Sequence, residues 1–367
     1  MFPSKVYVLG VGSIGCLVST QLAKISDRQI VLLLKDELTL NKFLNNESTL
    51  RYENLINLRN PIIQDFKFKA LSSVPKNQFG KVDFIENLIV TTKSYQTLRG
   101  LEKFLPALNK NSKVLFIQNG LGVIDKLNET LFADPETRPQ FYQGIISHGA
   151  FRQKKFAVKH VGLGDLKIAA LPRTIPTFNQ QEEFVNSTES EQNLVPDFIQ
   201  DIIKTPILNA QYLDYEDLLV TQYEKLIINS CINPITAILD SFNGELLKIE
   251  EMYPIFSKII QECIDVLTKS NLNTIRNHQN FNILLNKERL INVVFKVAEK
   301  TSRNSSSMRE DIRSLNETEI DYVNGYVVEL GKKYNVYTPY NRLICDLVKA
   351  KLSLNVYRNN DAIKMTL

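Results

Sequence analysis

Lysine and asparagine recur at intervals of four residues within an otherwise apolar stretch, Tyr223 to Asn243. If this stretch is a helix, Lys225, Asn229 and Asn233 share one narrow face, because each residue turns the chain by about 100°. An ammonium and two carboxamides on so apolar a helix must face one another, a bound polar ligand or water, since unpaired burial is costly. The stripe therefore predicts either a polar ligand site or a buried polar network that fixes helix packing.

A glycine turn near the amino end carries a second chemical signal. Residues 10–15 read GVGSIG, which is the G-x-G-x-x-G spacing of dinucleotide-binding turns. A strand is predicted over Lys5 to Leu9, an amphipathic helix to about Ile25, and a second strand over Gln29 to Leu34. This order of strand, turn, helix and strand predicts a nucleotide-binding turn. The alternative is a turn of this shape that has lost its ligand.

Each position of the turn has an expected task. Gly10 permits the tight turn, Gly12 lets the backbone approach a pyrophosphate, and Gly15 lets the helix pack closely on the strand. The N–H groups at the helix start, at Ser13 and Ile14, would then meet the phosphate charge.

The second strand ends at Lys35-Asp36, where NAD-binding folds usually place a carboxylate for the ribose 2′-hydroxyl. A lysine followed by an aspartate is ambiguous. We expect Lys35 to pair with a 2′-phosphate, which favours NADP; otherwise Lys35 is a solvated strand end.

Two further apolar runs, Asn87 to Thr92 and Lys113 to Gln118, are expected to be parallel strands. Polar residues follow both runs, at the edge of the sheet where open α/β folds bind ligands. We therefore predict Lys93 and Asn119 as site residues, although singly they could be a surface lysine and part of an ordinary turn.

The stretch from Tyr142 to Leu171 changes to short strands and is expected to finish the sheet with an antiparallel edge. His148 lies there at the end of an apolar run, and we expect a hydrogen-bonded histidine of the sheet edge rather than a catalytic group. No histidine or cysteine follows at metal-ligand spacing, so no metal site is predicted. The polar, acidic residues 174–196 are expected to form a mobile surface insertion.

Beyond Tyr212 the pattern is helical, which predicts a Rossmann-type α/β domain over residues 1–212 and an all-α domain over 213–367. The asparagine-rich residues 268–290 are expected to connect helices. Ser307 and Glu310 have the spacing of a capping box, although such a helix start could also bind a carboxylate. On the helix expected to follow, Glu319 shares an apolar face with Leu315 and Val323, so it needs a partner or a ligand.

Composition limits the possible functions. The chain has 367 residues, enough for two domains, and its net charge of +4 is too mild and too dispersed to predict nucleic-acid binding. Four cysteines without paired spacing favour a reducing compartment. An apolar strand that starts by Val6 leaves no room for a presequence, and no run is long enough to span a membrane, so we expect a cytoplasmic protein.

Taken together, these motifs resemble the ketopantoate reductase family, the NADPH-dependent 2-dehydropantoate 2-reductases. The resemblance rests on the glycine turn, VTTKSYQ around Lys93, IQNGLG around Asn119, KLIINSCINPITAI from Lys225, NGE from Asn243, and SSMREDI with TEIDYVNGY between Ser306 and Tyr326. It indicates a fungal-type member with loop insertions. The implied reaction reduces ketopantoate to pantoate, the step of pantothenate (vitamin B5) biosynthesis on the way to coenzyme A.

The resemblance also implies residue roles. Lys225 would be the general acid that protonates the ketone oxygen, and Glu319 would hydrogen-bond the substrate close to the cofactor. The carboxamides of Asn229, Asn233 and Asn243 would hold the hydroxyl, keto and carboxylate groups of the substrate, and Ser307 would bind its carboxylate. Asn119 would lie by nicotinamide and substrate, with Lys93 nearby. The two domains would close around the ketoacid.

The expected partners are a small 2-ketoacid and NADPH or NADP+, in a monomer or homodimer without nucleic acid or membrane. Two alternatives remain at this stage. One is a related NAD(P)-dependent 2-ketoacid or hydroxyacid dehydrogenase, and the other is a catalytically retired nucleotide-binding regulatory protein.

Overall fold

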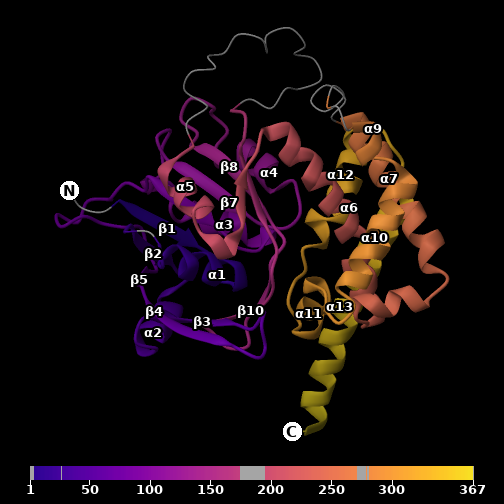
Figure 1. Ribbon diagram of the computed structural model, residues 1–367, viewed down its shortest axis with the longest axis horizontal. Helices are drawn as coiled ribbons and strands as arrows, with labels where there is room; N and C mark the ends of the chain where they lie inside the picture. The colour runs from indigo at the N-terminus through magenta and orange to yellow at the C-terminus, as the bar shows by residue number, and fades with distance from the viewer. Residues whose placement is uncertain (1–3, 26, 174–194, 271–277, 279–280, 367) are drawn as a thin grey trace. The chain divides into compact units, whose positions relative to one another are not determined.

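The computed structural model describes residues 4–25, 27–173, 195–270, 278 and 281–366 (Figure 1). The chain divides into two compact units. The first contains the residues up to Gln118 and Val123–Leu218, and the second contains Asn119–Gly122 and the residues from Leu219 onward. The domain boundary at residue 212 stays a prediction. Most of the predicted insertion 174–196, and part of 268–290, lie outside the described residues.

The first unit is built on an eight-stranded sheet with the order β12-β11-β8-β7-β6-β1-β2-β5. From β5 to β8 all neighbours pair in parallel, whereas β11 pairs antiparallel with β8. The strands are β1 Lys5–Leu9, β2 Gln29–Leu33, β5 Lys69–Leu71, β6 Asn87–Val90, β7 Lys113–Ile117, β8 Gln140–Ile146, β11 Leu166–Ala170 and β12 Ala210–Tyr212. The predicted α/β class and its parallel strands are confirmed.

A second, four-stranded sheet was not predicted. Its order is β4-β3-β10-β9, with β3 Thr49–Asn54, β4 Ile62–Lys67, β9 Gly149–Phe151 and β10 Ala157–Gly162. The expectation that the run around Ala157 would finish the main sheet was therefore wrong. That run pairs in parallel with β3, which lies about a hundred residues earlier in the chain. The antiparallel edge is confirmed for β11.

Helix α1 (Ser13–Leu22) is buried from Gly15 to its end because both sheets cover it. One buried cluster joins Cys16 and Leu17 of α1 with Val8 of β1, Tyr52 of β3 and Val158 of β10. In Figure 1 α1 lies between the main sheet and the strands β3 and β10. This packing holds the glycine turn that precedes α1 in a fixed position. The other helices of this unit are α2 Glu37–Asn45, α3 Thr97–Glu102, α4 Val123–Glu129 and α5 Asp197–Ile203.

The second unit is helical, as predicted. Its helices are α6 Tyr215–Leu239 (whose first turn belongs to the first unit), α7 Met252–Ser270, α9 Phe281–Leu284, α10 Lys287–Lys300, α11 Ser307–Arg313, α12 Asn324–Lys333 and α13 Pro339–Thr366. Short 3-10 turns, η4 Asn243–Lys248 and η5 Ile320–Tyr322, lie between them. Within the described ranges, no helix combines the length and apolar composition that crossing a membrane requires.

The single helix predicted to follow Ser307 was wrong. Helix α11 ends at Arg313, and Leu315 adopts a left-handed conformation with φ of 55°, which a continuing helix does not allow. The regular spacing of Leu315, Glu319 and Val323 was therefore a coincidence of the sequence and not a shared helix face.

Candidate active site

The three glycines of the turn meet different surroundings. Gly10 has φ of 100°, and a Cβ atom there would lie 2.5 Å from the amide nitrogen of Thr92. A Cβ on Gly15 would lie 2.6 Å from Thr91 Oγ1 and closer still to the carbonyl oxygen of Gly10. A Cβ on Gly12 would have no neighbour within 4 Å. Gly10 and Gly15 are thus required by the fold, while Gly12 keeps space open in front of α1.

The start of α1 offers unsatisfied donors to that space. Gly12 is the N-cap residue, and no side chain caps the helix. The first N–H groups of the helix, at Ser13 and Ile14, and the positive end of the helix dipole therefore face the opening. A nucleotide pyrophosphate fits such a turn in size and charge.

Arg152, just after β9, was missed by the sequence reasoning. Its guanidinium donates a hydrogen bond of 2.8 Å to the carbonyl oxygen of Val11 within the glycine turn. Burial raises the pKa of the nearby Cys16 thiol to about 12, and the charge of Arg152 opposes that rise. The arginine lies far from the turn in sequence, on the hairpin of the unpredicted second sheet, so no local motif could have revealed it.

Lys35 and Asp36 follow β2, as predicted. Asp36 is the N-cap of α2 and accepts a 2.7 Å hydrogen bond from the amide of Thr39. This bond, more than the neighbouring charge of Lys35, lowers the pKa of the Asp36 carboxyl. The Lys35 ammonium is largely exposed and lies 3.5 Å from Asp36 Oδ2. Lys35 therefore projects from the strand end, while Asp36 has a structural task there.

Lys93 lies at the carboxyl end of β6 and begins the turn η1 (Ser94–Gln96). Its side chain is half-buried, and its carbonyl oxygen accepts from the Thr97 hydroxyl at 3.2 Å. Gln118, at the end of β7, donates to the carbonyl of Thr92 at 2.6 Å. The loops after β6 and β7 are thus tied together at the carboxyl edge of the sheet.

Lys225 and Asn119 are brought together, although 106 residues separate them. The Lys225 ammonium donates a hydrogen bond of 3.0 Å to Asn119 Oδ1, and both residues belong to the second unit. The lysine is half-buried on α6. The acceptor oxygen fixes the direction of one ammonium proton, which orients the group.

The loop Asn119–Gly122 is seated on the segment that begins η5 and α12. The amide of Leu121 donates to the carbonyl of Tyr322 at 2.8 Å. Gly120 has φ of 77°, and a Cβ there would lie 2.5 Å from the same carbonyl oxygen. A Cβ on Gly122 would lie 2.8 Å from the ring of Tyr326. Two glycines are required here so that the loop can hold Asn119 in place.

Glu319 lies at the start of that same segment, as the N-cap of η5. It is 6% exposed, and its carbonyl oxygen accepts from the amide of Tyr322 at 3.0 Å. The helix predicted to carry Glu319 is absent, yet the expected burial of its carboxylate is found.

The carboxamides of Asn229 and Asn233 lie half-buried on the helix face that carries Lys225. Within the described part of the chain, neither carboxamide makes a hydrogen bond. The opposite face packs into the core through Ile227 and Cys231, both fully buried. The sequence predicted either a polar ligand site or a buried polar network at this stripe. The two asparagines do not form such a network with each other or with Lys225.

Pro234 removes the backbone donor that would normally bond the carbonyl of Ser230. Asn324, fully buried at the start of α12, replaces it: Asn324 Nδ2 donates to the Ser230 carbonyl at 3.1 Å. The helix that carries the polar stripe is therefore repaired from outside by a side chain, and not left with an unpaired carbonyl.

Asn243 begins η4 and is 8% exposed. Its Nδ2 donates to Thr301 Oγ1 at 2.9 Å, but its Oδ1 is buried without a partner among the described residues. A buried carboxamide oxygen without a donor is costly, so this atom suits a ligand that brings a hydroxyl.

The N-cap predicted at Ser307 was wrong by one residue, and the predicted pairing with Glu310 does not form a capping box. Ser306 is the N-cap of α11 and accepts from the amide of Arg309 at 3.1 Å. Ser306 is buried and also accepts from the Thr236 hydroxyl at 2.8 Å, which ties α11 to α6. Ser307 is exposed, and its hydroxyl has no capping task.

His148 was expected to be a hydrogen-bonded histidine of the sheet edge; it is hydrogen-bonded, and it is buried. Its Nε2 lies 3.0 Å from the carbonyl of Leu208, and its Nδ1 lies 3.0 Å from Nε2 of His160. Burial lowers the pKa of His160 to about 4, with the neighbouring His148 as a smaller cause. No group of three or more His, Cys, Asp or Glu side chains in the described ranges could hold a metal ion.

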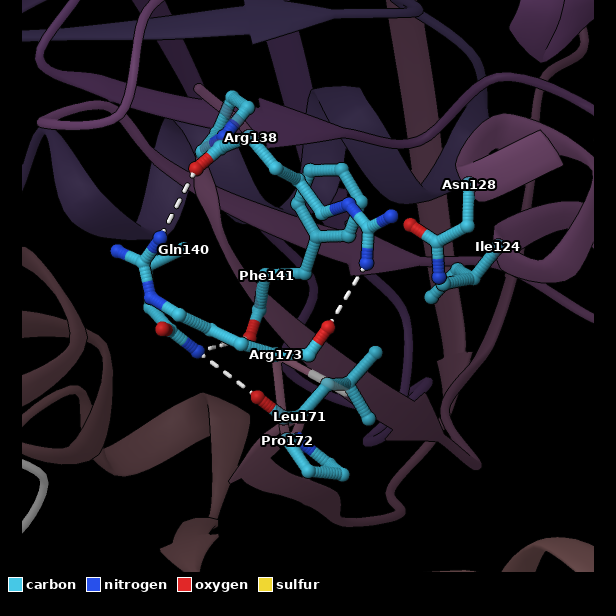
Figure 2. Close-up of a pocket in the computed structure, with 9 residues that line it drawn as sticks. Ile124, Asn128, Arg138, Gln140, Phe141, Leu171, Pro172 and Arg173 are labelled. Carbon is cyan, nitrogen blue, oxygen red and sulfur yellow. Dashed lines mark hydrogen bonds between the residues drawn. The ribbon is translucent and has the colours of Figure 1, made fainter. Parts of the chain in front are cut away.

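A small pocket of the first unit, shown in Figure 2, contains none of the predicted site residues. It lies at the amino end of β8, which is the sheet edge opposite the glycine turn because β8 runs parallel to the inner strands. Arg138 donates there to the carbonyls of Phe132 at 2.9 Å and Arg173 at 2.8 Å. These bonds close the loop before β8, so we assign this pocket to the fold and not to the site.

The family model described as "Ketopantoate reductase PanE/ApbA" matches residues 6–173 of the chain. The model described as "Ketopantoate reductase PanE/ApbA C terminal" matches residues 217–352. The chain belongs to the ketopantoate reductase family. Fungal proteins are among its members that are similar to this chain, as the sequence indicated.

Three curated relatives span nearly the whole chain. A probable 2-dehydropantoate 2-reductase of Schizosaccharomyces pombe is 38% identical and covers 96% of this chain and 97% of its own. The 2-dehydropantoate 2-reductase of Saccharomyces cerevisiae is 32% identical, with 97% and 96% covered. A cytochrome B translational activator, CBS2, of the same yeast is 26% identical, with 95% of both chains covered. Function therefore varies within the family.

Solved structures share the fold. D-mandelate dehydrogenase with NADH and anilino(oxo)acetate has a TM-score of 0.74 at 21% identity, covering 96% of this chain and 99% of its own. A probable 2-dehydropantoate 2-reductase of Bacillus subtilis has a TM-score of 0.68 at 23% identity, covering 95% and 99%. A ketopantoate reductase of Staphylococcus aureus, described as dimeric, has a TM-score of 0.65 at 15% identity, covering 96% and 99%.

Proposed function

We propose that this chain reduces 2-dehydropantoate (ketopantoate) to pantoate with NADPH, as a cytoplasmic step of pantothenate biosynthesis. Family membership supports an oxidoreductase of this kind. The observation that carries the proposal is the Lys225 ammonium held by Asn119, on the helix face where Asn229 and Asn233 present carboxamides without partners. A proton donor beside polar groups for a small hydroxy ketoacid is what this reaction requires.

The first unit fits the nucleotide. The open space at Gly12 and the uncapped start of α1, with Ser13 and Ile14, suit a pyrophosphate. Lys35 suits the 2′-phosphate, and Lys93 suits the ribose or nicotinamide half at the carboxyl edge of the sheet. When bound, NADPH supplies the hydride that the ketone carbon takes up.

Residues of the second unit would handle the proton and the substrate. Lys225 protonates the keto oxygen as negative charge grows on it, and then regains a proton from water. Asn119 Oδ1 accepts a hydrogen bond from the Lys225 ammonium, which orients that group. The Nδ2 donors of Asn119 therefore point away from Lys225. Glu319, which is buried, would hydrogen-bond the substrate.

The substrate's other groups have candidate partners. Asn229 and Asn233 offer carboxamides to its hydroxyl and keto groups. The unpartnered Oδ1 of Asn243 could accept from a substrate hydroxyl, and the exposed hydroxyl of Ser307 could donate to the carboxylate. Each contact uses a donor or acceptor that the protein does not occupy itself.

The function is tested by incubating the purified chain with NADPH and a panel of 2-ketoacids that includes ketopantoate, 2-ketoisovalerate and phenylglyoxylate. We expect ketopantoate to have the highest kcat/KM. Preference for phenylglyoxylate would place the chain with mandelate-type dehydrogenases instead. Binding of NADPH without reduction of any ketoacid would favour a regulatory protein, a possibility that the CBS2 relative makes concrete.

Lys225→Ala tests the proton donor. We expect kcat to fall by roughly a hundredfold or more, the usual scale for loss of a general acid, while the Kd for NADPH stays near that of the wild type. Lys296→Ala, which removes an exposed lysine of α10, serves as the matched control and should leave both constants unchanged. Unchanged turnover in Lys225→Ala would return this lysine to a structural role.

A further inference from the structure

The end of β2 carries a carboxylate that is already engaged. One oxygen of Asp36 accepts from the amide of Thr39 at 2.7 Å, and the other lies 3.5 Å from the Lys35 ammonium. A ribose 2′-hydroxyl that bonded Oδ1 would compete with the cap of α2, which contributes about 1 kcal/mol, and one that bonded Oδ2 would compete with the Lys35 ammonium. The residue that would normally favour NAD is therefore poorly placed to do so.

A second ammonium reaches the same strand end from another element. Lys103 follows directly after α3, and its Nζ donates to the main-chain carbonyl of Lys35 at 3.3 Å. Its side chain is exposed. No carboxylate of the described residues lies within ion-pair distance of it. The carbonyl uses one of three ammonium protons, so two remain for a ligand.

We propose that Lys103 and Lys35 together bind the 2′-phosphate of NADP, so that Lys103 is a further specificity-determining residue. This assignment rests on the proposed function for the identity of the nucleotide. A phosphate monoester carries between one and two negative charges at neutral pH, and two ammonium groups beside one capping carboxylate leave one positive charge to meet it. The carbonyl of Lys35 holds the second ammonium at the strand end before the ligand arrives, which reduces the ordering cost of binding.

Lys103 has a structural alternative, since its bond to Lys35 also fastens the end of α3 to the end of β2. The two roles predict different results for fragments of the cofactor. If Lys103 binds the phosphate, its removal weakens the binding of adenosine 2′,5′-bisphosphate but not of AMP, which lacks the 2′-phosphate. If Lys103 only fastens α3 to β2, its removal weakens the binding of both ligands equally, because both use the same adenosine site.

Calorimetric titration of the full chain with adenosine 2′,5′-bisphosphate and with AMP tests the proposal. We expect Lys103→Met to weaken the bisphosphate roughly tenfold, which is about 1.4 kcal/mol and typical of a lost charged hydrogen bond, and to change AMP less than twofold. Lys103→Arg should retain most of the affinity. Lys110→Met, an exposed lysine of the same unit, is the matched control and should change neither ligand.

Lys35→Ala extends the same test. It should weaken NADPH more than NADH, and in combination with Lys103→Met the two losses should not be additive, because both groups serve one phosphate. Equal weakening of the bisphosphate and AMP by Lys103→Met, or no weakening of either, would overturn the assignment. Fragment binding requires no turnover, so a chain that failed to reduce ketopantoate would still give a separate answer here.

Discussion

At the scale of single residues, glycine serves two purposes in the turn of residues 10–15. The hydrogen atom of Gly15 leaves room for the Gly10 carbonyl and the Thr91 hydroxyl, so the folded chain itself requires it. Gly12 has no neighbour to avoid, and its backbone is extended with φ of −81°, which any residue adopts. The missing side chain of Gly12 matters when something else fills the space.

Alanine at these two positions should therefore have different effects, one on stability and the other on NADPH binding. Gly15→Ala should lower the free energy of unfolding by about 1–3 kcal/mol, the usual cost of overpacking. Gly12→Ala should change it by less than about 0.5 kcal/mol but weaken NADPH binding strongly, because the methyl group would occupy the space that we propose for the pyrophosphate. Denaturation and NADPH titration of both variants check this, and a destabilised Gly12→Ala that binds normally would contradict it.

Residue types alone identified the polar stripe on α6, because an ammonium and two carboxamides stand out from an apolar helix. They could not reveal that Asn119 is the acceptor for Lys225, since the two meet only through the fold. The shift of the cap from Ser307 to Ser306 has a similar cause. Only Ser307 of three successive serines has a glutamate three residues later, but the contact with Thr236 holds Ser306 at the cap instead.

At the scale of elements, α6 depends on α12. Pro234 leaves the Ser230 carbonyl without its helical donor, and Asn324 supplies the missing bond at 3.1 Å. Asn324 also donates to Asn341 Oδ1 of α13 at 3.0 Å. One buried carboxamide thus joins three helices of the second unit.

A double-mutant cycle isolates the bond to Ser230. Asn324→Ala should destabilise the wild-type protein by about 1–3 kcal/mol, as expected when a buried acceptor loses its donor. In a Pro234→Ala background the helix restores its own bond to Ser230, so the same substitution should cost less by about 1 kcal/mol. Equal costs in the two backgrounds would show that Asn324 acts only through Asn341. Urea unfolding of the four proteins provides the measurement.

Elements with strong periodicity or continuous apolar runs were predictable. Strand β1 agrees with its prediction at both ends, and β2 ends one residue early. The second sheet was missed because β4 is largely exposed and gives no alternating apolar pattern, and because β3 and β10 pair across about a hundred residues. The helix predicted through Glu319 failed because propensity does not signal the left-handed turn at Leu315.

At the scale of the whole first unit, a chain of buried rings connects its parts. The hydroxyl of Tyr52 in β3 lies 3.1 Å from Nδ1 of His160 in β10. Nε2 of His160 lies 3.0 Å from Nδ1 of His148, which follows β8. His148 Nε2 faces the Leu208 carbonyl, which can only accept, so that nitrogen carries the proton. The amide of Gly164 donates to the other ring nitrogen, Nδ1, at 3.1 Å.

This network predicts sensitivity to mild acid. Burial lowers the pKa of His160 to about 4, below its ordinary value of 6.5, so the unfolded chain takes up a proton first. The contribution to stability is complete above pH 6.5 and is lost as the pH falls toward 4. Each pH unit in this window contributes about 1.4 kcal/mol, which gives at most about 3 kcal/mol in total.

Unfolding free energies measured by urea denaturation across this range provide the check. His160→Gln should be less stable than the wild type at pH 7 but should lose less stability on acidification. An unchanged slope in the variant would assign the acid sensitivity to other groups.

The seating of Asn119–Gly122 on Tyr322 and Tyr326 has a consequence for gene recombination. A crossover with a related reductase near residue 218 would join a foreign helical half to this tetrapeptide, which is encoded upstream of the junction. The hybrid would then keep Gly120 and Gly122, which fit against Tyr322 and Tyr326, but would take the residues at those two positions from the other parent. It would also keep Asn119 but take the residue at position 225 from the other parent. We therefore expect that chimeras which transplant the tetrapeptide with the helical half will be active more often than those made by a single cut.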